Sequence, residues 1–579
     1  MLNLKTLANH QQARRKKTFS LKKIIAAIPL VLFFVIMPKL QAQDLSNLKE
    51  VKPFTISGSL SAMGGFYSVD GIEPRQPNAL FNLSGNFTVN VYSLSLPFSF
   101  VLGNQEKNYS QPFNRFGVSP KYKWLTLHLG HRNVSFSPYT LAGHSFLGVG
   151  VEMNPGLFRF GAVYGNFQRE VASDSTNLNA VPAFKRKGYA YRLGIGNKSS
   201  YFDFILFKAK DDTLSADGFN LNDNVLPAEN LVLGISSRIQ TKSKVFFELD
   251  YAASAYTRDL RADDIDKDDI SFAKPIFSLF TPKTSSQVLT AAQAAIGYKG
   301  SDFGLSFRYK RIDPDYKSMG AYYFQSDLVS YTIEPYFKLF KRKLSVKSSL
   351  GFQHNNLNNT KAAQTNRSIG SFAVVYRPVR SLNFNFRYSN YGITQRDGYR
   401  TIDDTVRMAQ NNKSISGGTS YTILKTNNSH SFNLNASFQA LNDLNEQTSS
   451  FTENKNYNLQ FNYAFTYMPS GFNLFASFIR TKSVTQIDQI RVFAGPGFGL
   501  GKQWLDNNLN TSLNFNIMSN KLNGDKEGNI LNISFLSSYT IQKKHNLKFI
   551  YNFINNNSES TLTKAYKEST IKLSYTYTF

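Results

Sequence analysis

The chain has 579 residues, a net charge of +27, 14% aromatic residues and a mean hydropathy of −0.31. The aromatic content excludes a disordered protein, and the single long apolar run excludes a bundle of transmembrane helices. The absence of cysteine excludes disulfide scaffolds, thiolate zinc sites and cysteine nucleophiles.

The N-terminus has the parts of a secretory signal peptide. An apolar run of 14 residues, Ile24–Met37, follows a basic region and is shorter than the roughly 20 residues needed to span a bilayer. We therefore expect a signal peptide over 1–43, cleaved after Ala42 or Gln43. Removing it lowers the net charge from +27 to +19, because it takes away eight basic residues and no acidic residue.

Apolar and polar residues alternate in many later segments, for example Leu382–Ser389, Phe432–Gln439 and Tyr457–Tyr463. One face carries Phe, Tyr and Leu, and the other carries Asn, Ser, Thr and Gln with a few cations. A soluble sheet favours Lys and Glu on its wet face, whereas this pattern suits a lipid-facing exterior and a polar lumen. Since only a closed barrel satisfies the backbone of strands inside a bilayer, the fold is predicted to be an all-β, transmembrane, antiparallel up-and-down β-barrel.

The number of strands follows from the segments and the links between them. We find roughly 25 segments, but two periplasmic ends require an even number, so we predict about 24 strands within a range of 22–26. The region 79–145 is the least regular. Short links such as 300–302 and 380–381 alternate with long links such as 212–229 and 259–289, which predicts short periplasmic turns and long external loops. We assign 44–51 to a short periplasmic segment and 52–579 to one barrel, with no room for a separate plug domain.

The C-terminal strand places Leu573, Tyr575, Tyr577 and Phe579 on one face. It resembles the β-signal of bacterial outer-membrane proteins, a final strand that ends in Phe. The resemblance implies a Gram-negative cell outer membrane, recognition by the barrel-assembly machinery and contact with outer-membrane lipid. The run Arg311–Tyr323 is similar to an element of large uncharacterised, porin-like barrels of Bacteroidota, which implies no particular activity.

Two other clusters are weaker signals. His128 and His131 would point to opposite faces of a strand, and so would His144 and Ser145, so neither a metal site nor a catalytic dyad is favoured. The acidic run Asp263–Asp269 begins like a calcium loop but lacks its Gly and its final Glu, which favours an exposed acidic loop. We expect no enzyme activity, no metal and no cofactor.

Prolines in segment 104–144 are incompatible with regular central pairing. The segment is expected either to fold into the lumen or to form a bulged rim. A barrel of more than about 22 strands encloses a lumen that natural transporters keep plugged. We therefore take 104–144 and 259–289 as candidates for an internal constriction.

The functional hypotheses rest on charge and size. Basic residues are predicted on the lumen face at Arg308, Lys310, Arg387, Lys548 and Lys572. They indicate anion preference in a pore, contact of the basic chain with anionic outer-leaflet lipid, or ordinary solvated charge, and no nucleic-acid partner is expected. The first hypothesis is a porin-like channel constricted by its own loops or by a partner. The alternative is a non-enzymatic subunit of a larger outer-membrane export or assembly complex, with a partner lipoprotein or periplasmic plug as the stopper.

Overall fold

The computed structural model describes residues 53–104, 114–172, 182–215, 225–265, 279–321, 325–397, 407–445, 448–485, 489–559 and 564–579. The predicted signal peptide, its cleavage residues Ala42 and Gln43, and the segment 44–51 lie outside these ranges and stay predictions.

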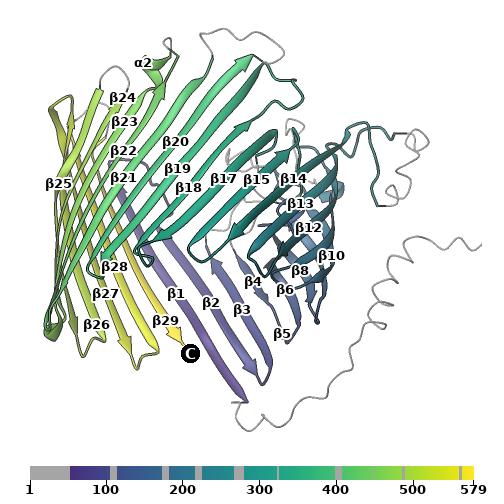
Figure 1. The fold of residues 1–579 in the computed structure, drawn as a ribbon. Helices are drawn as coiled ribbons and strands as arrows, with labels where there is room; N and C mark the ends of the chain where they lie inside the picture. The colour runs from purple at the N-terminus through teal and green to yellow at the C-terminus, as the bar shows by residue number, and fades with distance from the viewer. Residues whose placement is uncertain are drawn as a thin grey trace, which may run out of the picture.

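The chain forms one closed antiparallel β-barrel (Figure 1). Strand β1 (Phe54–Asp70) pairs with β29 (Tyr566–Thr578), and this pairing joins the two ends of the sheet. The short strands β4 (Arg115–Val118) and β5 (Lys121–Tyr122) both pair with the strands on either side of them, so together they are one interrupted wall strand. The wall therefore has 26 strands, at the upper limit of the predicted range and two more than the predicted number.

The remaining strands and helices have the following bounds. The first part of the wall contains β2 (Ala79–Val91), β3 (Leu94–Gly103), β6 (Leu125–Asn133), β8 (Ser145–Met153), β9 (Phe158–Gln168), β10 (Arg186–Gly196), β11 (Tyr201–Asp211), β12 (Glu229–Gln240), β13 (Val245–Thr257), β14 (Ser286–Lys299), β15 (Phe303–Ile312) and β17 (Leu328–Leu339). The second part contains β18 (Leu344–His354), β19 (Ala363–Val379), β20 (Leu382–Asp397), β21 (Ala409–Leu424), β22 (Asn428–Asp443), β23 (Asn454–Tyr467), β24 (Phe472–Thr485), β25 (Gln489–Trp504), β26 (Leu509–Leu522), β27 (Asp525–Ile541) and β28 (His545–Ser558). Outside the wall, the described residues also form β7 (Leu141–Ala142), β16 (Gly320–Ala321) and the short helices η2 (Thr213–Ser215), α2 (Ser449–Thr452) and η6 (Met468–Ser470).

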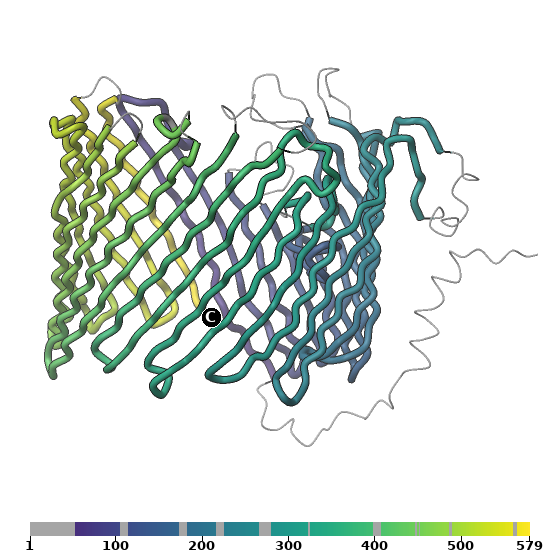
Figure 2. The backbone as a smooth tube through the Cα atoms, turned by 45° about the horizontal axis from the view of Figure 1, so that its top comes forward, coloured from purple at the N-terminus to yellow at the C-terminus, as the bar shows by residue number. Residues whose placement is uncertain are grey.

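Short turns, the first residue of β1 and the last residue of β29 share one rim of the barrel (Figure 2). The predicted links 300–302 and 380–381 join β14 to β15 and β19 to β20 at this rim, and the long links lie at the other rim. One exception is the tight turn between β26 and β27 at the long-loop rim, where Asn523 and Gly524 have φ of 52° and 101°. These positive angles suit a two-residue hairpin. We call the rim with short turns periplasmic and the other external.

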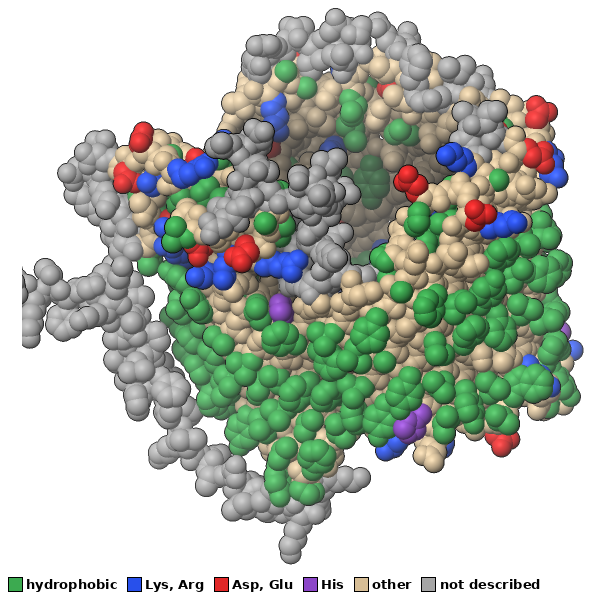
Figure 3. Space-filling view, turned by 180° about the vertical axis from the view of Figure 1, so that it is seen from behind, with side chains coloured by type: hydrophobic (Ala, Val, Ile, Leu, Met, Phe, Trp, Pro, Cys, Tyr) green, Lys and Arg blue, Asp and Glu red, His purple; other side chains and the backbone are tan. Residues whose placement is uncertain are grey.

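The two faces of the wall differ in chemistry. Outward apolar side chains are accessible, such as Phe204 with 57% of its surface exposed and Phe461 with 40%. On the face seen in Figure 3, apolar side chains cover much of the outer surface below the hollow mouth of the barrel. Among the described residues no helix has both the length and the apolar character to cross a membrane. A closed barrel with this apolar exterior is an outer-membrane protein, as predicted.

The missing strand of the prediction lies in the irregular region 79–145. Residues 115–133 contain two passes through the wall where one was expected. The first is interrupted at Ser119 and Pro120, and the chain then turns at Lys123, whose φ is 49°. Because proline has no N–H to donate to a neighbouring strand, the strand is broken at Pro120. The two pieces that remain, β4 and β5, are too short to show the alternation of apolar and polar residues by which the other strands were recognised.

Candidate functional site

Two segments leave the wall and pack on its inward face. Residues 134–144 connect β6 to β8, and residues 313–327 connect β15 to β17. They meet in a parallel pairing of β7 with β16, in which Leu141 lies opposite Gly320. We call residues 134–144, 313–321 and 325–327 the inner layer. Its buried apolar side chains are Val134, Phe136, Tyr139, Leu141, Tyr316 and Met319.

Hydrogen bonds join the two segments of the inner layer. The Tyr316 hydroxyl donates to the Tyr139 carbonyl at 2.8 Å, and the Ser318 hydroxyl donates to the Thr140 carbonyl at 2.6 Å. Both bonds are buried, so losing either would leave a buried carbonyl without this donor.

The inner layer is also bonded to the wall. The Met319 amide donates to Asn230 Oδ1 on β12 at 2.9 Å, and Ser254 Oγ on β13 donates to the Lys317 carbonyl at 2.7 Å. The Arg192 guanidinium on β10 lies 5.0 Å from the centre of the Phe136 ring, a cation–π contact.

Close approach to the wall requires small residues at two places. A Cβ atom on Gly234 of β12 would lie 2.5 Å from Thr140 Cγ2, and one on Gly320 would lie 2.6 Å from the Phe207 ring. The inward wall positions beneath the layer are apolar and buried, namely Ala190, Ile205, Phe207, Val232 and Ala252. The inner layer and this part of the wall therefore share one hydrophobic core.

The two predicted constriction candidates have different outcomes. In segment 104–144, residues 134–144 fold inward, as the first alternative expected, whereas residues 115–122 stay in the wall as an interrupted strand. In 259–289, the described end at Leu279 lies outside the lumen. Lys208, on the same outward face as the exposed Phe204, donates to the Leu279 carbonyl, which puts that end of the loop against the outer surface.

Residues 313–321 were not predicted to enter the lumen. The sequence of strand β11 contained a signal for this covering segment. Its inward residues Ile205 and Phe207 are apolar, although its outward residues such as Phe204 are apolar as well. A strand that is apolar on both faces is covered on both faces.

Ion pairs line the lumen beside the inner layer. Arg159 on β9 donates two hydrogen bonds to Asp203 on β11, at 2.7 and 2.8 Å. Glu152 on β8 lies 3.1 Å from His128 Nε2 and 3.0 Å from Arg192. Further along, Glu248 on β13 lies 3.6 Å from Arg238 and 4.0 Å from the predicted lumen residue Arg308. We call these residues of β6–β15 the ion-pair ladder, and its opposite charges largely neutralise one another.

The remaining lumen wall, β18–β29 with β1–β3, is lined mainly by amides and hydroxyls, and we call it the amide arc. Its side chains bond across strands, as when Asn458 donates to Thr481 at 2.9 Å and Asn532 donates to Asn516 at 2.8 Å. Three of the predicted lumen cations, Arg387, Lys548 and Lys572, lie on this inward face. In the described part of the chain none of the three forms an ion pair, unlike Arg308. Lys310 lies on the inward face of β15, two residues from Arg308.

The three clustered histidines do not form one site. His128 lies inward against Ser119 and Glu152, whereas the ring of His131 packs 5.2 Å from that of the exposed Phe116, so the two point to opposite faces as predicted. His144 Nδ1 contacts the carbonyl of Ser145 at 3.0 Å and not its hydroxyl. Burial, partly offset by this contact and reinforced by Arg186, lowers the pKa of His144 to about 4.

No group of three or more His, Asp or Glu residues in the described ranges is arranged to hold a metal ion. In the acidic run 263–269, Asp264 forms an ion pair with Lys283 at 2.6 Å. Asp266 and Asp268, which the calcium comparison also used, lie outside the described residues.

The predicted assembly signal lies on the strand that closes the barrel. Leu573 and Tyr575 are exposed on the outer face, the Phe579 amide donates to the Gly58 carbonyl at 3.0 Å, and its ring packs 5.5 Å from Phe87. The recognition of these residues by an assembly machinery stays a prediction.

No protein family model matches the sequence, and no curated protein matches it. Several solved barrel structures are similar. The P pilus usher (PapC) translocation pore has a TM-score of 0.39 at 12% identity, covering 90% of this chain and 99% of that chain. The FrpB iron transporter (F5-1 variant) of Neisseria meningitidis has a TM-score of 0.37 at 11% identity, covering 92% and 83%. OccAB2 of Acinetobacter baumannii has a TM-score of 0.29 at 13% identity, covering 65% and 96%. These values are too low to support an inference about what this chain does.

Proposed function

We propose that this outer-membrane barrel is a porin-like channel that favours small anionic solutes. The solutes pass along the amide arc, and the inner layer narrows the opposite side of the lumen. The observation that carries the proposal is the set of inward cations Arg387, Lys548 and Lys572, which lie among neutral amides and hydroxyls.

The charge argument compares the two parts of the lumen. In the ion-pair ladder, Asp203 and Glu152 lie within 3.0 Å of Arg159 and Arg192, so little net field is left for a solute. On the amide arc no such carboxylate balances the three cations in the described residues. Their field raises the local concentration of anions over cations.

Reversal potentials in planar bilayers test this proposal. Under a KCl gradient the protein should conduct with preference for chloride. Replacing all three residues (R387Q, K548Q and K572Q) should shift the reversal potential toward zero while leaving a conducting pore. K521Q is a matched control, because Lys521 lies on the outer face of β26 with the exposed Ile517, and it should change neither property. Cation preference, or no conductance from correctly folded protein, would refute the proposal.

A second function is favoured by the size of the lumen. The inner-layer contacts described above are to strands β10–β13, whereas the whole wall has 26 strands. Natural barrels of about 22 strands carry a plug. We therefore keep as the alternative a non-enzymatic subunit of an export or assembly complex, in which a lipoprotein or periplasmic protein closes the amide arc.

Purification from native membranes in mild detergent separates the two functions. A stoichiometric partner that lowers the conductance of the isolated barrel supports the export complex. A barrel that purifies alone and conducts selectively supports the channel.

Delivery to the membrane belongs to the same proposal. Export by the signal peptide 1–43 is followed by recognition of Leu573, Tyr575, Tyr577 and Phe579 by the barrel-assembly machinery. Deleting Phe579 should reduce the amount of folded barrel in the membrane, measured by heat-modifiable migration in gels, without changing the conductance of the molecules that do insert.

A further inference from the structure

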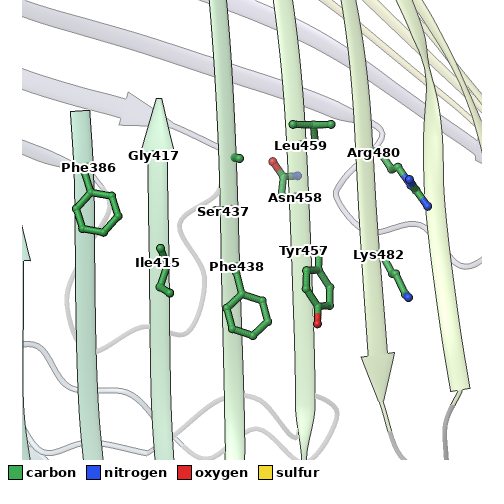
Figure 4. Close-up of a pocket in the computed structure, with 11 residues that line it drawn as sticks. Phe386, Ile415, Gly417, Ser437, Phe438, Tyr457, Asn458, Leu459, Arg480 and Lys482 are labelled. Carbon is green, nitrogen blue, oxygen red and sulfur yellow. The ribbon is translucent and has the colours of Figure 1, made fainter. Parts of the chain in front are cut away.

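The outer surface carries a groove of about 770 Å³ across β20–β24. Figure 4 shows the residues that line it, with Arg480 and Lys482 on β24 at one side of the apolar side chains of β20–β23. The lining residues belong mostly to the outward set, which also includes the exposed Phe461 and Phe478. The groove therefore opens toward lipid and not toward the lumen.

Small residues create the groove. Gly417 on β21 and Ala436 on β22 lie opposite each other, and Ala436 lies opposite Leu459 on β23. The larger side chains of Phe386 and Phe438 stand on either side of this hollow. The lining is mainly apolar and its shape is elongated across strands, as an acyl chain requires.

Two cations interrupt the apolar surface at the side of the groove. Arg480 lies opposite Leu459, and Lys482 lies opposite Tyr457, so both share the outward face. The Lys482 ammonium is 5.9 Å from the centre of the Tyr457 ring. In the part of the chain that the structure describes, neither cation forms an ion pair. An outward cation facing lipid is costly unless it reaches a polar group, so these positions call for an anionic partner.

The cations lie toward the external rim. Strand β24 starts at the periplasmic turn with Phe472 and ends at Thr485, so Arg480 and Lys482 are in its external half. One row further toward that rim, Lys413 and Lys455 flank Ala440 on the same outward face. The basic residues therefore lie where the headgroups of the external leaflet meet its acyl chains.

We propose that this groove binds one anionic, phosphate-bearing lipid of the external leaflet. An acyl chain lies over Gly417 and Ala436, and the lipid phosphate contacts Arg480 and Lys482, with Lys455 and Lys413 nearest to the rest of the headgroup. A guanidinium and an ammonium together provide the charge-assisted hydrogen bonds that a phosphate accepts.

Native mass spectrometry of the whole barrel, released from detergent with defined lipids, tests the proposal. Phosphatidylglycerol and diphosphoryl lipid A should remain bound as a single adduct, and zwitterionic phosphatidylcholine should not. In R480Q/K482Q the bound fraction should fall by roughly tenfold or more, the loss expected for two phosphate contacts. The lumen variant K548Q is the matched control and should keep the adduct.

A second variant tests the acyl chain separately. G417L should fold, because a Cβ on Gly417 would meet nothing closer than the Asn385 carbonyl at 3.8 Å. It fills the groove without changing a charge, and it should remove the adduct as well. Inorganic phosphate should not displace the lipid from the unchanged protein.

Equal retention of phosphatidylcholine, which has a phosphate but no net charge, would overturn the preference for an anionic lipid. An adduct that survives R480Q/K482Q would overturn the phosphate contact. Retention in G417L, or displacement by inorganic phosphate alone, would overturn the acyl-chain site.

Discussion

The wall beside the inner layer and the amide arc have the same strand geometry but opposite lumen chemistry. On β11, the inward residues Ile205 and Phe207 are buried against the inner layer. On β23, the inward residues Asn458 and Gln460 face the open lumen and bond to neighbouring side chains. The comparison shows that the residue types on the inward face of a barrel depend on their surroundings. They are apolar where a covering layer packs on them and rich in amides where they face water.

The same difference affects electrostatics. In the ion-pair ladder, the side chain of Asp203 is 1% exposed, so its pairing with Arg159 occurs away from water. On the amide arc, polar groups exchange protein partners for water at little cost. Mutations that are alike in chemistry should therefore have large effects in one part of the wall and small effects in the other.

The largest effect is expected for Asp203→Ala. It leaves the Arg159 guanidinium without its two hydrogen bonds in a mostly buried position. Loss of one partner of a buried pair costs about 3–5 kcal/mol in the free energy of unfolding. Urea unfolding of the barrel in lipid vesicles measures the change. The double variant D203A/R159A should recover part of the lost free energy of unfolding. A D203A variant as stable as the parent would show that water reaches this ion pair.

A smaller effect, confined to low pH, is expected at His144, next to the ring of Phe167 at 5.5 Å. Burial lowers its pKa to about 4 in the folded protein, against about 6.5 when unfolded. The unfolded state therefore binds the proton first, and stability is lost as the pH falls from about 6.5 to about 4, by roughly 2–3 kcal/mol. Unfolding measured across this range should show the loss in the parent protein. A flatter profile is expected in H144Q, and identical profiles would contradict the assignment.

Gly234→Val tests whether the inner layer narrows the lumen. The added Cβ would lie 2.5 Å from Thr140 Cγ2, so the layer must shift away from β12. Overpacking of this kind costs about 1–3 kcal/mol, and because the layer is displaced into the lumen, the single-channel conductance should fall or become noisy. The control is Gly501→Ala on the amide arc, where the nearest atom would be the Thr511 carbonyl at 3.4 Å. Unchanged conductance in G234V would show that the layer does not limit flow.

The amide arc was the part most accessible to prediction from sequence. Its strands alternate in almost every residue, as in Tyr457–Tyr463, because one face meets lipid and the other meets water. The short periplasmic turns were recognisable for the same reason, since each interrupts two clear alternations. The observed 26 strands lie within the predicted range of 22–26. The interruption at Pro120 removes the alternation in one pass of the wall, so roughly 25 segments were recognised, and the requirement for an even number then led to about 24 and not 26.

The candidate site was less accessible for a physical reason. The inner layer is held by contacts between residues far apart in the chain, such as Tyr139 with Tyr316, and alternation within one strand says nothing about such pairs. The prolines in 104–144 did indicate a departure from the wall. Loop 259–289 was selected for its length alone, and length does not distinguish a loop that folds inward from one with an end against the outer surface.

The smallest effect is expected for Asn458→Ala, and it completes the comparison with Asp203→Ala. Both changes remove a lumen-facing side chain that bonds to another strand. Asp203 on β11 bonds to Arg159 on β9, and the Asn458 amide on β23 donates to Thr481 on β24 at 2.9 Å. Because the lumen is open here, water replaces the lost partner and the cost should be about 0.5 kcal/mol or less. The same vesicle unfolding assay measures it. A cost close to that of Asp203→Ala would mean that the amide arc is covered in the functional state, which would favour a partner closing the lumen over an open channel.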